Sequence, residues 1–413
     1  MRPRVGFIAL FVAEIVSALG NRMSIVAIPW LVLVTTDSPA KMGLVAVGQL
    51  LPYLLAGVLA TPLADRFGLR AASIATDVGS ALATAAIAAI PGIGFSAILG
   101  LVAVAGALRG VGDRAKHVLL RPMAEAAGAR MVRVTAAYEG LARGAMLVGA
   151  PLGGLLIYWF GAQGAIWVDA VSFAVCAAIV AALVRPPAEP DVAPVSEPYL
   201  QALRGGVRYL RHDRLLLGLL AMIFLANLFS QASTAVFVPI WVSDVVGSPA
   251  LLGTILGAFA AGAVLGSILF TALAPTLPQR TTFLIALAVG GSPQLLVLLS
   301  HNLPLVLAVT FCCGVAMASL NPILGAIQYE RIPTHLQTRV FGLATAICYA
   351  GLPVGGALGG LAAAALGLNP AILLAGCLYL AVTLVTLFRL RSRDPAMPTR
   401  QPNSGHGLPH ERT

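Results

Sequence analysis

Ionisable side chains interrupt the apolar runs in the first half of this chain. Glu14 and Arg22 lie eight residues apart in one such run, about two turns of a helix, so both can face one cavity. Charged groups are costly within a membrane and usually line a water-accessible path or pair with one another. A carboxyl buried in an apolar helix is also suited to binding and releasing protons. Two interpretations remain open for Glu14: a proton carrier, or one half of a permanent pair with Arg22 or Arg109.

The other ionisable residues within apolar runs also belong to the first half. Asp113 ends one predicted helix, and Glu139 lies four residues before Arg143, the spacing of an ion pair on one helix face. We interpret these residues as gating or structural pairs, and we expect Asp77 and Asp169 to hydrogen-bond to neighbouring helices. The residues predicted to take part in proton coupling or charge pairs are Glu14, Arg22, Asp77, Arg109, Asp113, Glu139 and Arg143.

The second half offers uncharged polar side chains where the first half has charged ones. This asymmetry favours ion coupling through the first half and a substrate held between both halves. The residues predicted to line the substrate cavity are Asn21, Trp30, Asn227, Gln231 and Asn321.

No arrangement typical of an enzyme accompanies these residues. The six histidines fall in predicted loops or in the tail without metal-ligand spacing, so we expect no metal site. A Gly-rich phosphate loop is also missing from the sequence, which disfavours ATP-driven transport. We therefore expect no cofactor, with a proton gradient as the energy source. The five cysteines lie in apolar segments and are interpreted as small hydrophobic residues.

The composition indicates that membrane helices position these groups. Of 413 residues, 59% are hydrophobic and only 10% are charged, whereas a soluble domain carries about a quarter charged residues. The formal net charge of +10 comes from short basic clusters between apolar runs, so we expect no nucleic-acid partner. Segments of about 20 apolar residues, enough to span a bilayer, are predicted at 6–34, 42–63, 71–91, 95–112, 136–160, 163–184, 215–242, 250–274, 281–300, 304–327, 340–366 and 370–390.

These segments form two groups of six on either side of a polar stretch. We predict an all-α membrane protein with an N-terminal six-helix bundle (1–184), a cytoplasmic linker with a surface helix (185–214), a C-terminal six-helix bundle (215–390) and a disordered tail (391–413). Basic residues gather in alternate connections and at both termini, so the positive-inside rule places both termini in the cytoplasm. All four tryptophans fall near helix ends on the opposite side, as an interfacial belt would.

The two groups of segments repeat one another. Pro29 aligns with Pro239 and Gly43 with Gly253 at one offset, and a second offset aligns the fifth segment with the eleventh. A parallel duplication of six helices is typical of transporters with a site between the halves. Small residues let helices approach closely, and proline permits a bend. The residues predicted to form tight packing or hinges are Gly149, Pro151, Gly153, Gly154, Gly351, Pro353, Gly355 and Gly356.

The loop after the second segment carries a specific resemblance. Residues 63–70 read Leu-Ala-Asp-Arg-Phe-Gly-Leu-Arg, which resembles the signature loop of the major facilitator superfamily. The resemblance implies a conformational latch in which an aspartate pairs with basic groups and a helix N-terminus of the other half. A solvated turn that only follows the basic-loop pattern is the alternative. The latch residues would be Asp65, Arg66, Gly68 and Arg70.

Three further stretches, 17–30, 168–173 and 339–342, resemble the drug-efflux branch of that superfamily, which contains macrolide-efflux and enterobactin-exporter-like proteins. The stretch 149–151 resembles a motif associated with antiporters. Many members of the branch carry Asp where Asn21 stands, so the resemblance assigns no proton role to this position.

The expected function is secondary active transport: proton-coupled efflux of a small amphipathic molecule, such as a drug, antibiotic or secondary metabolite, by alternating access. We expect a monomer in the inner (plasma) membrane of a bacterium, with the lipid bilayer and a small-molecule substrate as partners. An importer, or a siderophore or metabolite exporter, remains open because a fold does not fix the direction of transport. A receptor or membrane enzyme is less favoured, since it would leave the duplication unexplained.

Overall fold

The computed structural model describes residues 3–90, 92–186, 207–245, 247–274 and 276–393. Every regular element within these ranges is a helix. In chain order they are α1 (Pro3–Thr36), α2 (Pro39–Phe67), α3 (Leu69–Ala89), α4 (Phe95–Ala126), α5 (Met131–Leu183), α7 (Arg214–Ala232), the π-helix η1 (Ser233–Phe237), α8 (Val238–Val245), α9 (Pro249–Leu273), α10 (Gln279–Gly290), α11 (Ser292–Leu296), the 3₁₀-helix η2 (Val297–Leu299), α12 (Leu303–Met317), α13 (Leu320–Arg331), α14 (Thr334–Leu366) and α15 (Leu368–Arg393).

Eleven helical stretches of the described chain are long and apolar enough to cross a membrane. One of them, Leu147–Leu183, is interrupted at Gly161, whose φ of 71° is a left-handed conformation that favours glycine. Because α5 turns at this residue, it supplies two spans in succession. The described residues thus contain the twelve spans that the sequence predicts, within an all-α architecture.

Proline explains why two predicted spans of the second half are broken rather than continuous. Pro293 has no N–H to bond the carbonyl of Val289, and the helix ends between α10 and α11. The Cys313 thiol donates to that carbonyl instead, at 3.2 Å. Pro322 likewise has no N–H for the carbonyl of Ala318, where α12 gives way to α13. The predicted spans 281–300 and 304–327 are confirmed as Thr281–Leu299 and Leu303–Arg331, but each consists of two helices or more.

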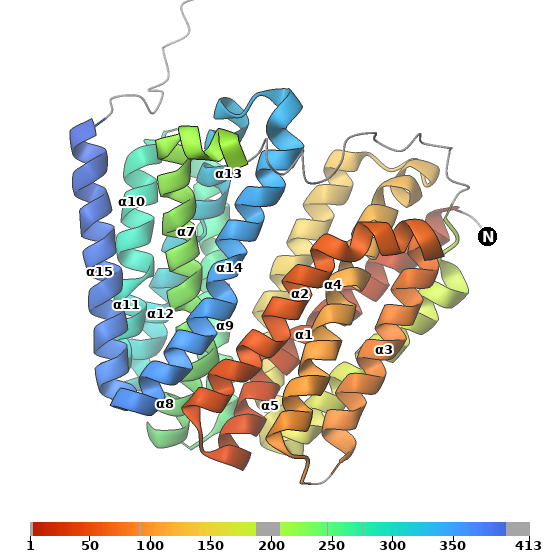
Figure 1. The fold of residues 1–413 in the computed structure, drawn as a ribbon, viewed down its shortest axis with the longest axis horizontal. Helices are drawn as coiled ribbons and strands as arrows, with labels where there is room; N and C mark the ends of the chain where they lie inside the picture. Colours follow the sequence, from red (N-terminus) through yellow and green to blue (C-terminus); the bar gives the residue numbers. More distant parts are fainter. Residues whose placement is uncertain (1–2, 91, 187–206, 246, 275, 394–413) are drawn as a thin grey trace, which may run out of the picture.

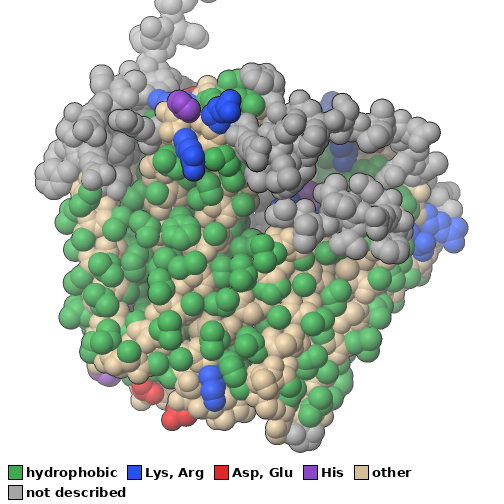
Figure 2. All heavy atoms as spheres, viewed as in Figure 1, with side chains coloured by type: hydrophobic (Ala, Val, Ile, Leu, Met, Phe, Trp, Pro, Cys, Tyr) green, Lys and Arg blue, Asp and Glu red, His purple; other side chains and the backbone are tan. Residues whose placement is uncertain are grey.

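The sides of the molecule are apolar, as a lipid-facing surface requires. Large hydrophobic side chains such as Leu82, Ile268 and Leu361 are exposed. Figure 2 shows hydrophobic side chains along the sides of the face in view, while most of its Lys and Arg side chains gather toward the upper end. This distribution fits a bilayer around the middle of the helices.

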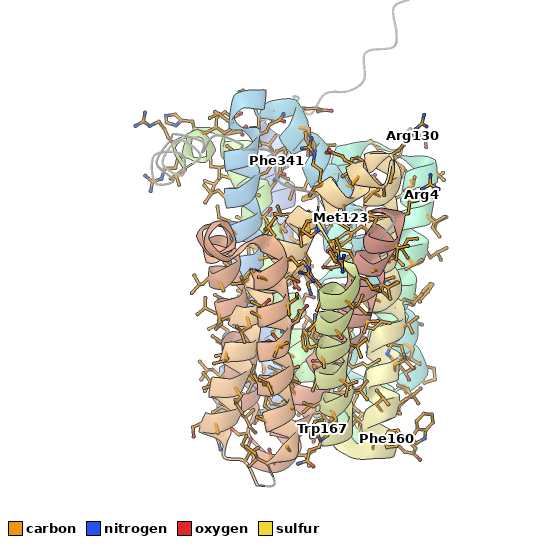
Figure 3. All side chains as sticks on the ribbon, turned by 90° about the vertical axis from the view of Figure 1, so that its right-hand side faces the viewer. Arg4, Met123, Arg130, Phe160, Trp167 and Phe341 are labelled. Carbon is orange, nitrogen blue, oxygen red and sulfur yellow. The ribbon has the colours of Figure 1, made fainter. Side chains whose placement is uncertain are left out.

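The labelled side chains of Figure 3 mark the two ends of the bundle. Arg4 and Arg130 lie at one end, and Phe160 and Trp167 lie at the other (Figure 3). The chain also begins and α15 also ends at the end that carries Arg4 (Figure 1). The predicted tryptophan belt is only half right: Trp159 and Trp167 are exposed, but Trp30 and Trp241 are buried among apolar side chains.

The most extensive contacts between the N-terminal spans and the C-terminal spans are those of α2 with α14 and of α5 with α9. A Cβ atom on Gly43 would lie 2.3 Å from the carbonyl oxygen of Gly356 and 3.0 Å from Cα of Gly360, so α2 and α14 approach backbone to backbone. Gly154 faces Gly253 in the same way, with 2.8 Å from its Cβ position to the Gly253 nitrogen. Figure 1 shows α2 and α14 converging at the end opposite the N-terminus.

The predicted packing glycines lie at close helix contacts, while their hinge role stays a prediction. Within the first half, Gly149 lies against Arg22 and Gly153 against Met23. Within the second half, a Cβ on Gly355 would lie 1.9 Å from the carbonyl oxygen of Leu228 in α7. A Cβ on Gly351 would lie 2.2 Å from the carbonyl oxygen of Phe224. Pro151 lies inside α5, and Pro353 lies inside α14.

Most of the predicted linker and tail lies outside the described residues. Residues 187–206 of the linker are not described, and residues 207–212, within the predicted surface helix, are helical. The predicted tail begins within α15, which continues to Arg393, and residues 394–413 are outside the description.

Candidate substrate cavity

A cavity of about 330 Å³ opens between α1, α2, α4, α5 and α14. Two acids and two bases line it: Glu14 and Asp113, and Arg22 and Arg109. Four charged residues that the sequence places in two separate apolar runs, or directly after one of them, therefore share one space. Its other polar lining side chains are Ser17, Asn21, Gln49, Tyr53, Tyr138 and Tyr349.

One face of α1 forms the longest wall of this cavity. Its lining residues recur every three or four positions, which is the spacing of side chains on one face of a helix. α2 runs alongside, and its close contact with α14 at Gly43 and Gly356 lies near the end of the molecule opposite the N-terminus. The cavity thus lies between this contact and the end where the chain begins.

Glu14 is buried in the cavity wall, and its electrostatic interaction with the buried Lys116 is not a direct ion pair. The Tyr138 hydroxyl donates to Oε2 at 3.5 Å, while Oε1 is buried and accepts no hydrogen bond. Among the described residues, no arginine or lysine nitrogen lies within 4.0 Å of this carboxyl. No ion pair of Glu14 with Arg22 or Arg109 is therefore formed in this conformation, and both interpretations of Glu14 stay predictions.

Arg22 and Arg109 also face the cavity without a carboxylate within 4.0 Å among the described side chains. The guanidinium carbon of Arg109 lies 5.7 Å from the ring centroid of Tyr53 and 5.9 Å from that of Phe173. These distances are within the range of cation–π attraction. The aliphatic part of the Arg22 side chain lies against Gly149. A Cβ atom on Gly149 would lie 2.5 Å from the Cβ atom of Arg22. Glycine at this position leaves room for the arginine.

Lys116 corrects the prediction that helix 4 ends at residue 112. α4 continues to Ala126, and Lys116 is buried inside the first half with 1% of its side chain exposed. Its ammonium lies 3.1 Å from Asp77 in α3 and 3.8 Å from Asp113, which lines the cavity. The Cys176 thiol in α5 donates to Asp77 at 3.1 Å. Lys116 and Asp113 look like loop residues in the sequence, because the sequence does not show that the charges of Lys116, Asp113 and Asp77 neutralise one another inside the protein.

Asp169 forms the predicted hydrogen bond to a neighbouring helix. The Ser24 hydroxyl of α1 donates to one carboxylate oxygen, and the Ser172 hydroxyl lies 3.3 Å from the other. Gly20 allows this contact, because a Cβ there would lie 2.6 Å from the Asp169 carboxylate. Asp169 therefore fastens the second part of α5 to α1 and does not line the cavity of about 330 Å³.

Comparison with known proteins decides the family. A family model described as "Transmembrane secretion effector" matches residues 3–406. The chain belongs to this family of major facilitator transporters. The multidrug efflux pump Tap of Mycobacterium tuberculosis (strain ATCC 25618 / H37Rv) is 31% identical over 403 residues, which cover 95% of this chain and 93% of the relative. The pump of the same name from Mycolicibacterium fortuitum is 30% identical over 397 residues, with 93% and 96% covered.

A solved transporter structure supports the fold. The crystal structure of the nucleoside transporter NupG matches with a TM-score of 0.77 at 9% sequence identity, over 94% of this chain and 99% of that chain. Identity this low concerns the fold alone. The protein is thus an integral, multi-pass membrane transporter with the major facilitator fold.

The predicted cavity residues of this facilitator lie in different places. Asn21 lines the cavity, and its side-chain oxygen is buried without a hydrogen-bond donor. Trp30 is buried in the apolar core, Asn321 is exposed, and the Asn227 amide donates to the Cys348 carbonyl at 2.8 Å. Neither these three residues nor Gln231 lines the cavity, so their part in a substrate path stays a prediction.

Only part of the predicted latch falls on described side chains. Gly68 is the single residue between α2 and α3, and its φ of 77° requires glycine or a strained alternative. An Arg70 guanidinium nitrogen donates to the Ala181 carbonyl of α5. The side chains of Asp65 and Arg66, and those of the predicted pair Glu139 and Arg143, lie outside the described ones.

The sequence does not identify three tyrosines that line the cavity or the buried lysine beside it. Tyr53, Tyr138 and Tyr349 line the cavity from three helices, but an aromatic residue within an apolar run looks the same whether it faces lipid or a cavity. One signal was available for Lys116. It stands three residues after Asp113, the spacing of an ion pair within a continuing helix.

Proposed function

We propose that this transporter exports small amphipathic molecules, such as drugs, antibiotics or secondary metabolites, in exchange for protons. One observation carries the proposal: Glu14 is a buried carboxyl that faces a drug-sized cavity, has one oxygen without a hydrogen-bond partner, and has no cation within 4.0 Å among the described residues. Buried acids of this kind in membrane transporters serve as ion or proton sites. The name of the Tap relatives, multidrug efflux pumps, supports the direction and the substrate class.

The proposed orientation places both termini in the cytoplasm of a bacterium, with the protein in the plasma membrane. Arg4 and Arg130 lie at the end where the chain begins, and basic residues favour the cytoplasmic side. The close contacts of Gly43 with Gly356 and of Gly154 with Gly253 lie toward the other end. In this orientation they would close the outer side and leave the cavity facing inward.

Exchange would follow from competition at a single carboxyl. A substrate that enters from the cytoplasm displaces the proton of Glu14, and the halves then rock about the α2–α14 and α5–α9 contacts. On the outside, the Glu14 carboxylate is protonated again and the substrate dissociates. The protein would work as a monomer, since each chain contributes both halves around its own cavity, and it would use no cofactor besides the proton gradient.

The latch would bias this cycle. Asp65, Arg66 and Arg70 follow the superfamily signature, and a helix N-terminus attracts a carboxylate. We propose that the loop stabilises one of the two conformations and releases it during transport.

Proteoliposomes test this function. An imposed pH gradient, acidic on the side that receives the dye, should drive tetramethylrhodamine or its ethyl ester out of the compartment that faces the cytoplasmic ends. The variant Glu14→Gln should bind dye but lose the response to the gradient. Glu125→Gln is a matched control, because Glu125 is an exposed acid that pairs only with Arg121 on its own helix among the described residues. Transport that ignores the gradient, or intact coupling in Glu14→Gln, would refute proton exchange; accumulation in the opposite direction would identify an importer.

A further inference from the structure

The cavity of this transporter carries two unlike charge sites on one helix. Glu14 and Arg22 both line it from α1, and eight residues at 1.5 Å each place them about 12 Å apart along the helix axis. Asn21 lies between them, with a buried side-chain oxygen that lacks a donor. The wall is therefore negative toward the end where the chain begins and positive deeper in.

Both sites are incompletely matched by the protein itself. Lys116 lies 3.1 Å from Asp77 and 3.8 Å from Asp113, and it also interacts electrostatically with Glu14, but no cation among the described residues comes within 4.0 Å of the Glu14 carboxyl. At the other site, Arg22 and Arg109 come from α1 and α4 and find no carboxylate within 4.0 Å in the described part of the chain. A guanidinium presents a planar set of donors that suits a carboxylate, sulfonate or phosphate.

The remaining walls add no further charge from the described side chains. α2, α5 and α14 contribute the hydroxyls of Tyr53, Tyr138 and Tyr349, and the last two lie on opposite halves. Aromatic rings beside charged groups favour flat, partly apolar molecules. An occupant that matches these walls has an aromatic body with one cationic and one anionic end.

We propose that the preferred substrates are aromatic molecules that carry a cationic nitrogen, either a protonated amine or an iminium, and an acidic group on the order of 10 Å apart, a spacing taken from the helix rise. The cationic end binds at Glu14, and the acidic group binds between Arg22 and Arg109. This inference rests on the proposed function, which it deepens by naming the substrate class. A purely cationic molecule binds more weakly, because it leaves both guanidinium groups unmatched and is repelled by them.

Equilibrium binding to detergent-purified full-length protein tests the inference without any gradient. Tetramethylrhodamine carries a cationic xanthene and a carboxylate, and its ethyl ester has the same scaffold without the acid. Fluorescence anisotropy should show at least tenfold tighter binding of the acid than of the ester. Arg22→Gln and Arg109→Gln should each remove most of this preference by weakening the acid form and leaving the ester unchanged or tighter. Glu14→Gln should weaken both dyes.

Arg121→Gln serves as the matched control. Arg121 is an exposed arginine of α4 that pairs with Glu125 and does not line the cavity, so its removal should leave both affinities unchanged. Size-exclusion profiles and melting temperatures check that each variant is folded.

Several results would overturn the inference. They are equal or tighter binding of the ester to the wild type, an equal loss of both dyes in folded Arg22→Gln, and binding of neither dye. If the ester is preferred and its export is still driven by a proton gradient, proton-coupled efflux stands and only the substrate class fails. If the acid is preferred but no gradient drives its transport, the substrate class stands and the proposed function fails.

Discussion

Replacement of Lys116 by methionine isolates the energetics of the buried charges beside the cavity. The substitution keeps the length and apolar stem of the side chain but removes the ammonium that lies 3.1 Å from Asp77. The pair is almost fully enclosed, with 1% of the Lys116 side chain and 4% of the Asp77 side chain exposed. Asp77 would keep only the Cys176 thiol, at 3.1 Å, as a described donor.

The expected cost follows from this burial. Removing one partner of a buried ion pair leaves an uncompensated charge and costs about 3–5 kcal/mol. That is a large share of a total stability of about 5–15 kcal/mol. Asp77→Asn together with Lys116→Met removes both charges at similar volume and should recover most of the loss, because no unpaired charge remains. Arg121→Met, at a pair whose side chains are 76% and 58% exposed, should cost under about 1 kcal/mol.

Equilibrium unfolding in mixed micelles titrated with sodium dodecyl sulfate measures these differences by the loss of helical circular dichroism. The double variant is the decisive sample. If Lys116→Met costs as little as Arg121→Met, the site is open to water and the assigned burial is wrong. If the double variant is no more stable than Lys116→Met alone, the loss comes from packing and not from the unpaired charge of Asp77.

Three further substitutions probe other parts of the account. Gly154→Val should abolish transport while the protein still inserts and binds dye, because the new side chain meets the backbone of Gly253 and Pro249, where even a Cβ would lie within 3.0 Å; normal transport by this variant would show that α5 and α9 need not close so tightly. Cys313→Val should cost about 0.5–1.5 kcal/mol in the same unfolding assay and Cys313→Ser less, because only serine still donates to the Val289 carbonyl; equal losses would remove that role from the hydrogen bond. Asp65→Asn should slow dye transport severalfold with normal insertion in the membrane, and an unchanged rate would leave the loop as a plain turn.

The fold was predictable because its signals are long and repeated. Twenty-residue apolar runs, alternating basic connections and the Pro29–Pro239 repeat all act at the scale of whole helices. Helix ends were less predictable, because the rule that charges belong in loops fails when they pair inside the protein. Lys116 and Asp77 are the example, and they extend α4 well past the predicted end.

The cavity was predictable on the side of the charges and less so on the side of the neutral groups. Burial of a charge in a membrane has few explanations, and four of the seven residues predicted for proton coupling or charge pairs, Glu14, Arg22, Arg109 and Asp113, line the cavity, while their roles stay predictions. A side-chain amide can form its hydrogen bonds with many different partners. The Asn227 amide, for example, donates to a carbonyl of a neighbouring helix, and only the three-dimensional structure reveals this contact.

Proton release on substrate binding tests the competition at Glu14 most directly. Tetramethylrhodamine is added to the purified protein in a weakly buffered solution near neutral pH, and a pH indicator follows the protons set free. The account predicts that binding releases protons from the wild type and from Glu125→Gln, and that Glu14→Gln binds residual dye without release. Binding to the wild type without proton release, or equal release from Glu14→Gln, would contradict exchange at this carboxyl.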